Sequence, residues 1–599
     1  MAAGARAARL FLQRWREQLD TSFAPRRART LGACAALEEV IALADSALRS
    51  GGQTKPAIDP EEGGHGVQML PDVAAEAERT LKRDVLLNSR YGPRCEALLE
   101  SLKHAKPDKV DELRGALAQM NVLAPLLRRS YVADAFEEAQ RTIEGAPESH
   151  DKIARLCESI VSELRAQGWS DTGLLEACGA LPPDDDVAAV GSLAARVCSA
   201  RQQFECYVGL TLPVDRPPFP DGVQGFQIVE ALPDASLTGR PLKKGTYAKV
   251  LIEAFDPMAA AATAHRRVLS TVGALTVFLP ESRIDVSSEV VGVRLPDRSI
   301  RGCETQERLP EEKRSIDPEG IKRILASSWD ASSTPAADPL HDAIRLRHRA
   351  ISKSDPETRL LLLWSGIERM TSGARGFRGG ALAAAKELVS HAVTLGKLRR
   401  DVGDFAAVME HAVVAEPARG DLLRLVGGYG EDGSRVDRVH RRRVLEHLLG
   451  DKAKLQQMIA PFYATEPLLA FRAHRLWEDL GSGSGSSISR GKAIAEYHER
   501  SRQRVAWQVG RIYRARNRVA HVGVGPERLK DLVAHAHFYL TQIIAICVHH
   551  GGTHPVRAQE LLTTRMGQYQ AYVELLRRGD SACLGPDALL RPTGVLERR

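Results

Sequence analysis

The stretch that most constrains the fold is Val505 to Val519, where apolar residues recur at helical spacing. At about 100° per residue, Val505, Val509, Ile512 and Val519 fall within one narrow stripe of a helix. Such a stripe faces a core, so the stretch predicts an amphipathic helix in a helical bundle. Arg516 lies on the same stripe, where a guanidinium is costly unless it is paired or lines a site.

His521 falls on nearly the opposite side of that helix if the helix continues unbroken, and it then shares a face with Arg514 and Asn517. Arg516 and His521 can therefore meet within one chain only if the helix bends or ends between them. Gly523 and Pro526 favour an end soon after His521. Alternatively, the two residues meet across a two-fold dimer.

The same region is strongly basic, with no acidic residue between its first and last arginine. The run comprises Arg500, Arg502, Arg504, Arg511, Arg514, Arg516 and Arg518. A run of this kind favours a polyanionic partner, and Trp507 and Tyr513 offer rings on which bases can stack. The alternative is a solvated basic face that ends in one histidine.

The segment Arg511 to Gly523, RIYRARNRVAHVG, resembles the core motif of HEPN domains (higher eukaryotes and prokaryotes nucleotide-binding). That motif is R-x4-6-H, often with a polar residue after the arginine, and the ApeA-like group places an aromatic-Arg-x-Arg-Asn run before the histidine. Leu362 to Met370, LLWSGIERM, resembles an earlier helix of that group, with Glu368 at its usual acidic position. The resemblance covers roughly residues 338–579, interrupted by a long insertion.

The resemblance implies a metal-independent endoribonuclease that needs no cofactor and acts as a homodimer. His521 would act on the ribose 2′-hydroxyl or the leaving oxygen, Arg516 would stabilise the phosphate, Asn517 would position one of them, and Glu368 would support the site. The residues expected to contact RNA are Arg511, Tyr513, Arg514 and Arg518. A role in phage defence or stress response follows from the family. Other members are non-catalytic RNA- or nucleotide-binding modules, which is the alternative function.

The residue types suit this chemistry. Attack by a 2′-hydroxyl on its own phosphate requires proton transfer, and histidine titrates near neutral pH. Charge developing on the phosphorane requires a fixed cation, which a guanidinium supplies. A third hypothesis is a helical interaction protein with no nucleic-acid role, because a chain this long always offers some basic cluster.

Composition sets further bounds. A chain of 599 residues is too long for one core and predicts three or four domains. The net charge of +7 fits a polyanionic partner better than a basic one. The nine cysteines are scattered without a C-x-x-C pair, which indicates a reducing cytoplasm and no clustered metal site. No apolar run is expected to cross a bilayer.

The chain is predicted to be mainly α, with an N-terminal helical region, a small α+β domain and a C-terminal HEPN-like antiparallel bundle that contains a helical insertion. The boundaries are 1–200 for the helical region, 201–300 for the α+β domain, 301–337 for a connector, 338–373 for the first part of the bundle, 374–487 for the insertion and a Gly/Ser linker, 488–579 for the second part, and 580–599 for a loose tail. Within the α+β domain, strands are expected at 204–212, 227–230, 249–255, 275–279 and 287–295, with a helix from Pro257 to about Ala274.

Two further features bear on function. Arg438 to Arg443, RVHRRR, is either a solvated helix face or an extension of an RNA-binding surface. The N-terminal region shows no chemistry of its own, and we expect it to restrain the nuclease or to respond to a trigger, because free ribonuclease would poison its own cell.

Overall fold

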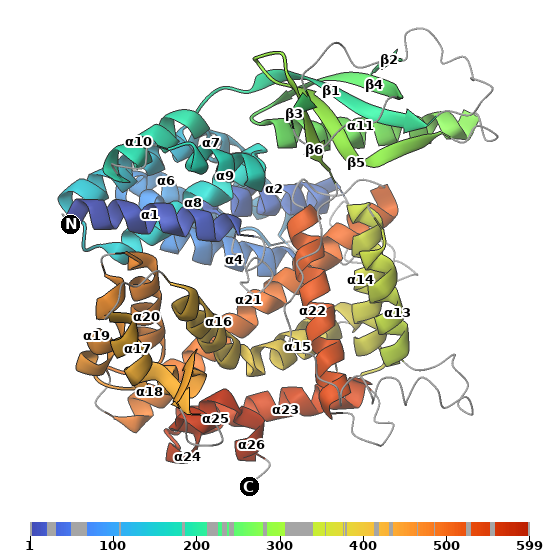
Figure 1. The fold of residues 1–599 in the computed structure, drawn as a ribbon. Helices are drawn as coiled ribbons and strands as arrows, with labels where there is room; N and C mark the ends of the chain where they lie inside the picture. The colour runs from blue at the N-terminus through green and yellow to red at the C-terminus, as the bar shows by residue number, and fades with distance from the viewer. Residues whose placement is uncertain are drawn as a thin grey trace.

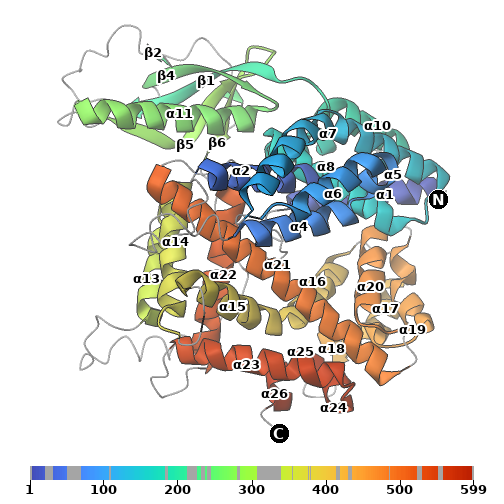
Figure 2. The ribbon, with the colours of Figure 1, turned by 180° about the vertical axis from the view of Figure 1, so that it is seen from behind.

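The structure is a computed structural model that is mainly helical, with a small sheet in the middle of the chain, as the sequence predicts. Figures 1 and 2 show the α+β domain above two helical parts, with the N-terminal helices to one side of the C-terminal ones. The structure describes residues 3–20, 31–49, 69–106, 109–181, 186–211, 226–230, 237–238, 245–278, 284–305, 339–353, 355–374, 377, 380–412, 418–429, 435–463, 465–483, 486–522, 529–550 and 558–596.

The N-terminal helices enclose one large apolar core. They are α1 (Ala3–Leu19), α2 (Ala33–Arg49), α4 (Leu70–Arg83), α5 (Val85–Arg90), α6 (Gly92–Lys103), α7 (Val110–Gly145), α8 (His150–Gln167), α9 (Asp171–Gly179) and α10 (Asp186–Val197). The rings of Phe11, Trp15 and Phe136 pack together at centroid distances of 6.0 to 6.2 Å. The buried indole of Trp15 donates a hydrogen bond to the Leu174 carbonyl at 3.1 Å, so burial of this large side chain leaves no polar cost.

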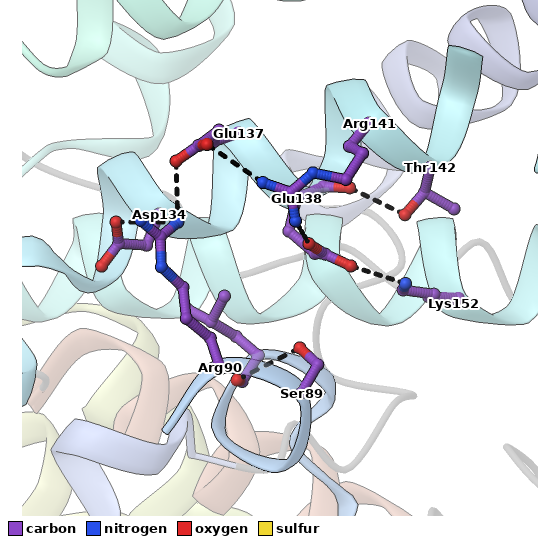
Figure 3. Close-up of polar contacts among 9 residues, drawn as sticks. Ser89, Arg90, Asp134, Glu137, Glu138, Arg141, Thr142 and Lys152 are labelled. Atoms are coloured by element: carbon purple, nitrogen blue, oxygen red, sulfur yellow. Dashed lines mark hydrogen bonds and ion pairs between the residues drawn. The ribbon is translucent and has the colours of Figure 1, made fainter. Parts of the chain in front are cut away.

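One polar side of this bundle is a balanced network of ion pairs around α7 (Figure 3). Arg90 lies 2.7 Å from Glu137 and 3.1 Å from Asp134, and Lys152 of α8 lies 2.6 Å from Glu138. Such partly exposed pairs each contribute little to stability. Because every cation of this network faces a carboxylate, the network ties the helices together.

The α+β domain is a six-stranded sheet with one helix packed against it. Its elements are β1 (Gln202–Thr211), β2 (Gln227–Val229), β3 (Leu237–Thr238), β4 (Thr246–Ala254), α11 (Pro257–Phe278), β5 (Asp285–Arg294) and β6 (Ile300–Glu304), in the sheet order β2-β4-β1-β5-β6-β3. All pairings are antiparallel except β3 with β6. Alternate residues of the central strands form a core with α11, which is the pattern expected for a sheet covered on that face.

Two expectations for this domain are corrected. Residues 275–279 do not form a strand, because α11 continues to Phe278, and a short apolar run cannot distinguish a buried helix end from a strand. The strand β6 was not predicted at all. It is short and follows a tight turn in which Arg298 has a φ of 67°.

The C-terminal half has two cores that share one long helix. Its elements are α13 (Pro339–Ile351), α14 (Pro356–Thr371), α15 (Gly380–Leu395), α16 (Lys397–His411), α17 (Ala418–Val426), β7 (Gly427–Tyr429), β8 (Arg435–Val439), α18 (Arg441–Leu448), α19 (Lys452–Ile459), a 3₁₀ turn (Ala460–Phe462), α20 (Pro467–Asp479), α21 (Ser487–Val522), α22 (Leu529–His550), α23 (Ala558–Arg577), α24 (Ser581–Leu584), α25 (Pro586–Leu590) and α26 (Pro592–Leu596). The helix α21 crosses this half diagonally, and its C-terminal end lies beneath the α+β domain (Figures 1 and 2).

The residues of the two cores differ from the predicted domain boundaries in two places. The first contains α13, α14, α15, α22 and the C-terminal part of α21, so α15 packs within the bundle although it was assigned to the insertion. The second contains α16 to α20 with the N-terminal part of α21 and most of α23. Cys583 and Leu589 are buried in this second core, so residues 580–596 are packed helices rather than a loose tail.

The helix α22 corrects the statement that no segment is long and apolar enough to cross a membrane. Residues 529–549 are long and apolar enough by length and composition alone, and more than half of this stretch is buried inside the fold. The core helix of a soluble protein passes the same test, so this is weak evidence for a span.

Candidate functional site

The motif lies near the end of α21, which continues without a break from Ser487 to Val522. The helix therefore ends just after His521, as Gly523 and Pro526 suggest, and not between Arg516 and His521. In an unbroken helix these two positions differ by about 140° around the axis and by about 7.5 Å along it. The backbone of one chain thus places them on different sides.

The guanidinium of Arg516 is held by two of the predicted site residues. Its Nη1 donates to Asn517 Oδ1 at 2.9 Å, and its Nη2 lies 3.8 Å from Glu368 Oε2. The side chains of Arg516 and Glu368 are 31% and 28% exposed. The structure therefore joins two segments that are far apart in the sequence and leaves their charged groups accessible to a ligand.

The hydrogen bond to Asn517 also affects where the guanidinium lies. Positions 517 and 521 are one turn apart and about 40° from each other around the helix axis. By accepting from Arg516, Asn517 draws the guanidinium around the helix toward the side on which position 521 lies. The structure describes the backbone of His521 and not its side chain.

Glu368 is positioned by α14, whose start matches the sequence prediction. Asp355 caps the helix, with its Oδ2 accepting from Thr358 N at 2.7 Å, and Pro356 occupies the first turn. Such caps fix where a helix begins, and hence the direction in which a residue three turns later projects.

Tight packing then sets α14 against its neighbours. The rings of Trp364 and Tyr513 lie 5.4 Å apart in the bundle core. A Cβ on Gly366 would lie 2.7 Å from Leu540 Cδ2, so the glycine allows α14 and α22 to approach closely. Tyr513 is only 9% exposed, which corrects the prediction that its ring lies on an RNA-binding surface.

Arg511 and Arg514 are also not on an open surface. Both point into the contact between α21 and the N-terminal helices, where Glu39 of α2 pairs with both guanidiniums and Glu76 of α4 pairs with Arg511. The side chains of Arg511 and Arg514 are 8% and 14% exposed. In this structure carboxylates of the same chain hold these two arginines, although both were expected to contact RNA.

The pKa values of Glu39 and Glu76 are shifted in opposite directions. Burial raises the pKa of Glu39, the guanidiniums of Arg511 and Arg514 lower it, and the net result lies below the ordinary value for glutamate. For Glu76 burial outweighs the attraction of Arg511, and the pKa is raised. Glu39 is therefore the carboxylate whose charge the fold stabilises.

The sequence did contain a signal for Glu76. In α4 the buried positions are Leu70, Val73, Ala74, Glu76, Ala77 and Leu81, so a carboxylate stands on an apolar stripe just as Arg516 does on α21. An inward acid requires a cation, but nothing in a single sequence identifies which cation that is. Glu39 gives a weaker signal, because its side chain is 23% exposed.

The remaining arginines of the run differ in their environment. Arg500 lies 2.7 Å from Asp479, and Arg502 lies 2.6 Å from Glu499. Arg518 is exposed and has no ion pair among the residues that the structure describes. Of the four predicted RNA contacts, Arg518 is thus the one that faces solvent.

Over the described ranges no group of three or more His, Cys, Asp or Glu residues is placed to hold a metal ion. Comparison with protein-family models, with curated proteins and with solved structures finds no match to this chain.

Proposed function

We propose that this chain is a HEPN-like, metal-independent endoribonuclease whose site is formed by Arg516, Asn517 and His521 with support from Glu368. The observation that carries the proposal is the Arg516–Asn517–Glu368 contact, which orients a partly exposed guanidinium five residues before a histidine. A fixed cation beside an imidazole suits transfer of a proton at the 2′-hydroxyl or leaving oxygen with stabilisation of the phosphate.

The unbroken helix favours a site shared by two chains. Because the backbone separates Arg516 from His521 by about 140°, a two-fold pairing of α21 ends would set Arg516 of one copy opposite the histidine of its partner. We further propose a cytoplasmic homodimer that acts on RNA, with the N-terminal helices as its regulator in phage defence or stress response.

The first experiment is cleavage of total RNA in EDTA by wild type, Arg516→Ala and His521→Ala. Loss of a general acid or base typically costs about 10² to 10⁴ in rate. The matched control is His411→Ala, which removes an exposed histidine at the end of α16 and should leave cleavage unchanged. Equal rates for wild type and His521→Ala would refute the assignment of His521.

A mixing experiment tests the two-chain site. A mixed dimer of Arg516→Ala and His521→Ala chains contains one site with both wild-type residues and one with neither. Random pairing would then restore about a quarter of the wild-type sites, whereas a site within one chain would stay inactive in every mixture.

The alternative is a non-catalytic RNA- or nucleotide-binding module with the same fold. The separation of Arg516 from His521 within one chain favours it if no dimer forms. Intact RNA bound with a steep salt dependence, and no cleavage under any trigger, would establish this alternative.

A further inference from the structure

A second group of arginines gathers where the N-terminal helices meet the first half of α21. Arg79 and Arg83 come from α4, Arg155 from α8, Arg475 from α20, and Arg500 and Arg504 from α21. We propose that this arginine cluster binds the sugar-phosphate backbone of single-stranded RNA and delivers it to the motif at the end of α21. The delivery step rests on the function proposed above, whereas the binding step does not.

Side-chain contacts bring the four helices together. Arg79 donates to Gln503 Oε1 and lies over the ring of Trp507 at 5.6 Å. Asp151 joins α8 to α20, lying 2.6 Å from Arg155 and 3.1 Å from Arg475. The cluster therefore forms where helices distant in the sequence pack together, and it is not a run of sequence neighbours.

Positive charge exceeds negative charge at this junction. Asp151 serves two arginines, Asp479 serves Arg500 at 2.7 Å, and Glu158 pairs with Arg14, which lies outside the cluster. Among the residues that the structure describes, Arg83 and Arg504 have no carboxylate within ion-pair distance.

Burial and the crowding of like charge both lower the pKa values of these two side chains. Burial lowers the pKa of Arg83, and the nearby guanidiniums of Arg504 and Arg79 lower it further. Burial likewise lowers the pKa of Arg504, with Arg475 and Arg500 adding to the effect against Glu158. Guanidiniums held close together with fewer carboxylates than cations are relieved by an incoming anion.

The aromatic ring indicates which anion fits. Trp507 follows Arg504 by one turn of α21 and is half-buried under Arg79, an arrangement of cations and a stacking ring that suits single-stranded nucleic acid. RNA also provides phosphates at regular spacing, which an acidic protein surface does not.

The cluster and the motif lie on the same side of α21, and the N-terminal helices cover the stretch between them. Positions 500, 504, 507, 511, 514, 518 and 521 recur at alternate spacings of four and three, and so lie along one side of the helix. Arg500 and Arg504 belong to the cluster, and Trp507 follows them. Arg511 and Arg514 lie under Glu39 and Glu76, and Arg518 is exposed again. Arg504 lies about 18 Å along the axis before Arg516.

The test is binding of a fluorescein-labelled single-stranded RNA of mixed sequence, measured by anisotropy in EDTA over a range of salt, in the full-length His521→Ala background. Arg83→Glu/Arg504→Glu should weaken binding by at least about tenfold at low salt. Because Arg504 is half-buried, Arg83→Glu/Arg155→Glu, which changes two exposed residues, should show the same loss in a chain that folds normally. The control with equal charge change is Arg114→Glu/Arg578→Glu, at side chains 68% and 71% exposed elsewhere.

Neutralisation gives a quantitative check. Each lost phosphate contact reduces the slope of log K against log salt by about 0.7 for a single strand, so Arg83→Gln/Arg504→Gln should reduce it by about 1.4. Equal weakening by the control variant, no weakening by either cluster variant, or no binding by the His521→Ala chain at low salt would overturn the proposal, and the last result would leave an acidic protein as the partner.

The outcomes also separate this inference from the nuclease proposal. RNA that is bound through the cluster but never cleaved by wild type refutes the nuclease and keeps the cluster. If cleavage requires His521 but the cluster substitutions leave the affinity for RNA unchanged, the proposal for the cluster is refuted and the nuclease proposal stands.

Discussion

Neutralising Glu39 should release the N-terminal helices from α21. Glu39 pairs with both Arg511 and Arg514, and its Oε2 lies 3.1 Å from Arg511 Nε. The substitution Glu39→Gln leaves two largely buried guanidiniums facing only Glu76. Removing one partner of a buried ion pair typically costs about 3 to 5 kcal/mol, because the remaining charge is buried without compensation.

The pKa shifts of Glu39 and Glu76 predict which of the two substitutions to glutamine destabilises the fold more. Since the fold holds the pKa of Glu39 below and that of Glu76 above the ordinary value, the charge of Glu39 contributes more stability. We therefore expect Glu39→Gln to cost more than Glu76→Gln at neutral pH. The contribution of Glu39 is present above its unfolded pKa of about 4.3 and is lost as the pH falls through its lower folded value.

Amide hydrogen exchange of α2, α4 and the middle of α21 measures this opening. A loss of about 3 to 5 kcal/mol corresponds to roughly 100- to 4000-fold faster exchange in these helices, since about 1.4 kcal/mol is tenfold. The control is Asp421→Asn, which removes an exposed pair with Arg424 and should cost less than about 1 kcal/mol. Unchanged exchange in Glu39→Gln, or a larger effect in Glu76→Gln, would contradict the reasoning.

Three further changes test the fold. Burial and a hydrogen bond with Asp355 raise the pKa of Glu357 to about 7, so stability should fall as pH rises from about 4.3 through 7, and Glu357→Gln should flatten the melting temperature over that range. Burial lowers the pKa of His498 to about 4, so stability should fall as pH drops below about 6.5, and melting curves of His498→Phe should lose this dependence. A Cβ at Gly491 would lie 2.0 Å from the Leu576 carbonyl oxygen, so urea titration of Gly491→Ala should show a loss of about 1 to 3 kcal/mol or more, whereas Gly567→Ala, with open space around it, should gain up to about 1 kcal/mol.

Local signals predicted the elements that carry the site. The apolar stripe of 505–519 gave the helix and its buried side, and the Asp355-Pro356 pair gave the start of α14. Glu368 enters the sequence prediction only as a supporting residue implied by the family resemblance, and its contact with Arg516 comes from the structure. The helical stripe and the capping pair are both local signals, because the residues that form each of them are close together in the sequence.

Long-range partners were beyond this kind of inference. The stretch from Arg500 to Arg518 contains no acidic residue, which favours a polyanionic partner. Its acidic partners Glu39 and Glu76 reach Arg511 and Arg514 from another domain. The same limit explains α15, which follows α14 across a glycine-rich segment in the sequence yet packs back into the same core. Charge and periodicity along a chain describe a helix face but not what covers it.

The covering of α21 also restricts how two copies can pair. Its stripe from Arg500 to Arg514 is occupied by the cluster and by the N-terminal helices, whereas Arg518 and Ala520 are exposed. A two-fold contact that unites Arg516 with the histidine of another copy must therefore use the last turns of α21, and it can form while the N-terminal helices stay docked.

Ala520→Glu tests this restriction, because it places a charged side chain on the proposed contact without touching Glu39 or Glu76. We expect a monomer by sedimentation, loss of cleavage, and unchanged hydrogen exchange in α2 and α4. The matched control is Ala75→Glu, at another exposed helical alanine on α4, which should leave the dimer intact. A dimer that survives Ala520→Glu with full cleavage would mean that Arg516 and His521 do not meet at this end of the helix, and the two-chain site would have to be abandoned.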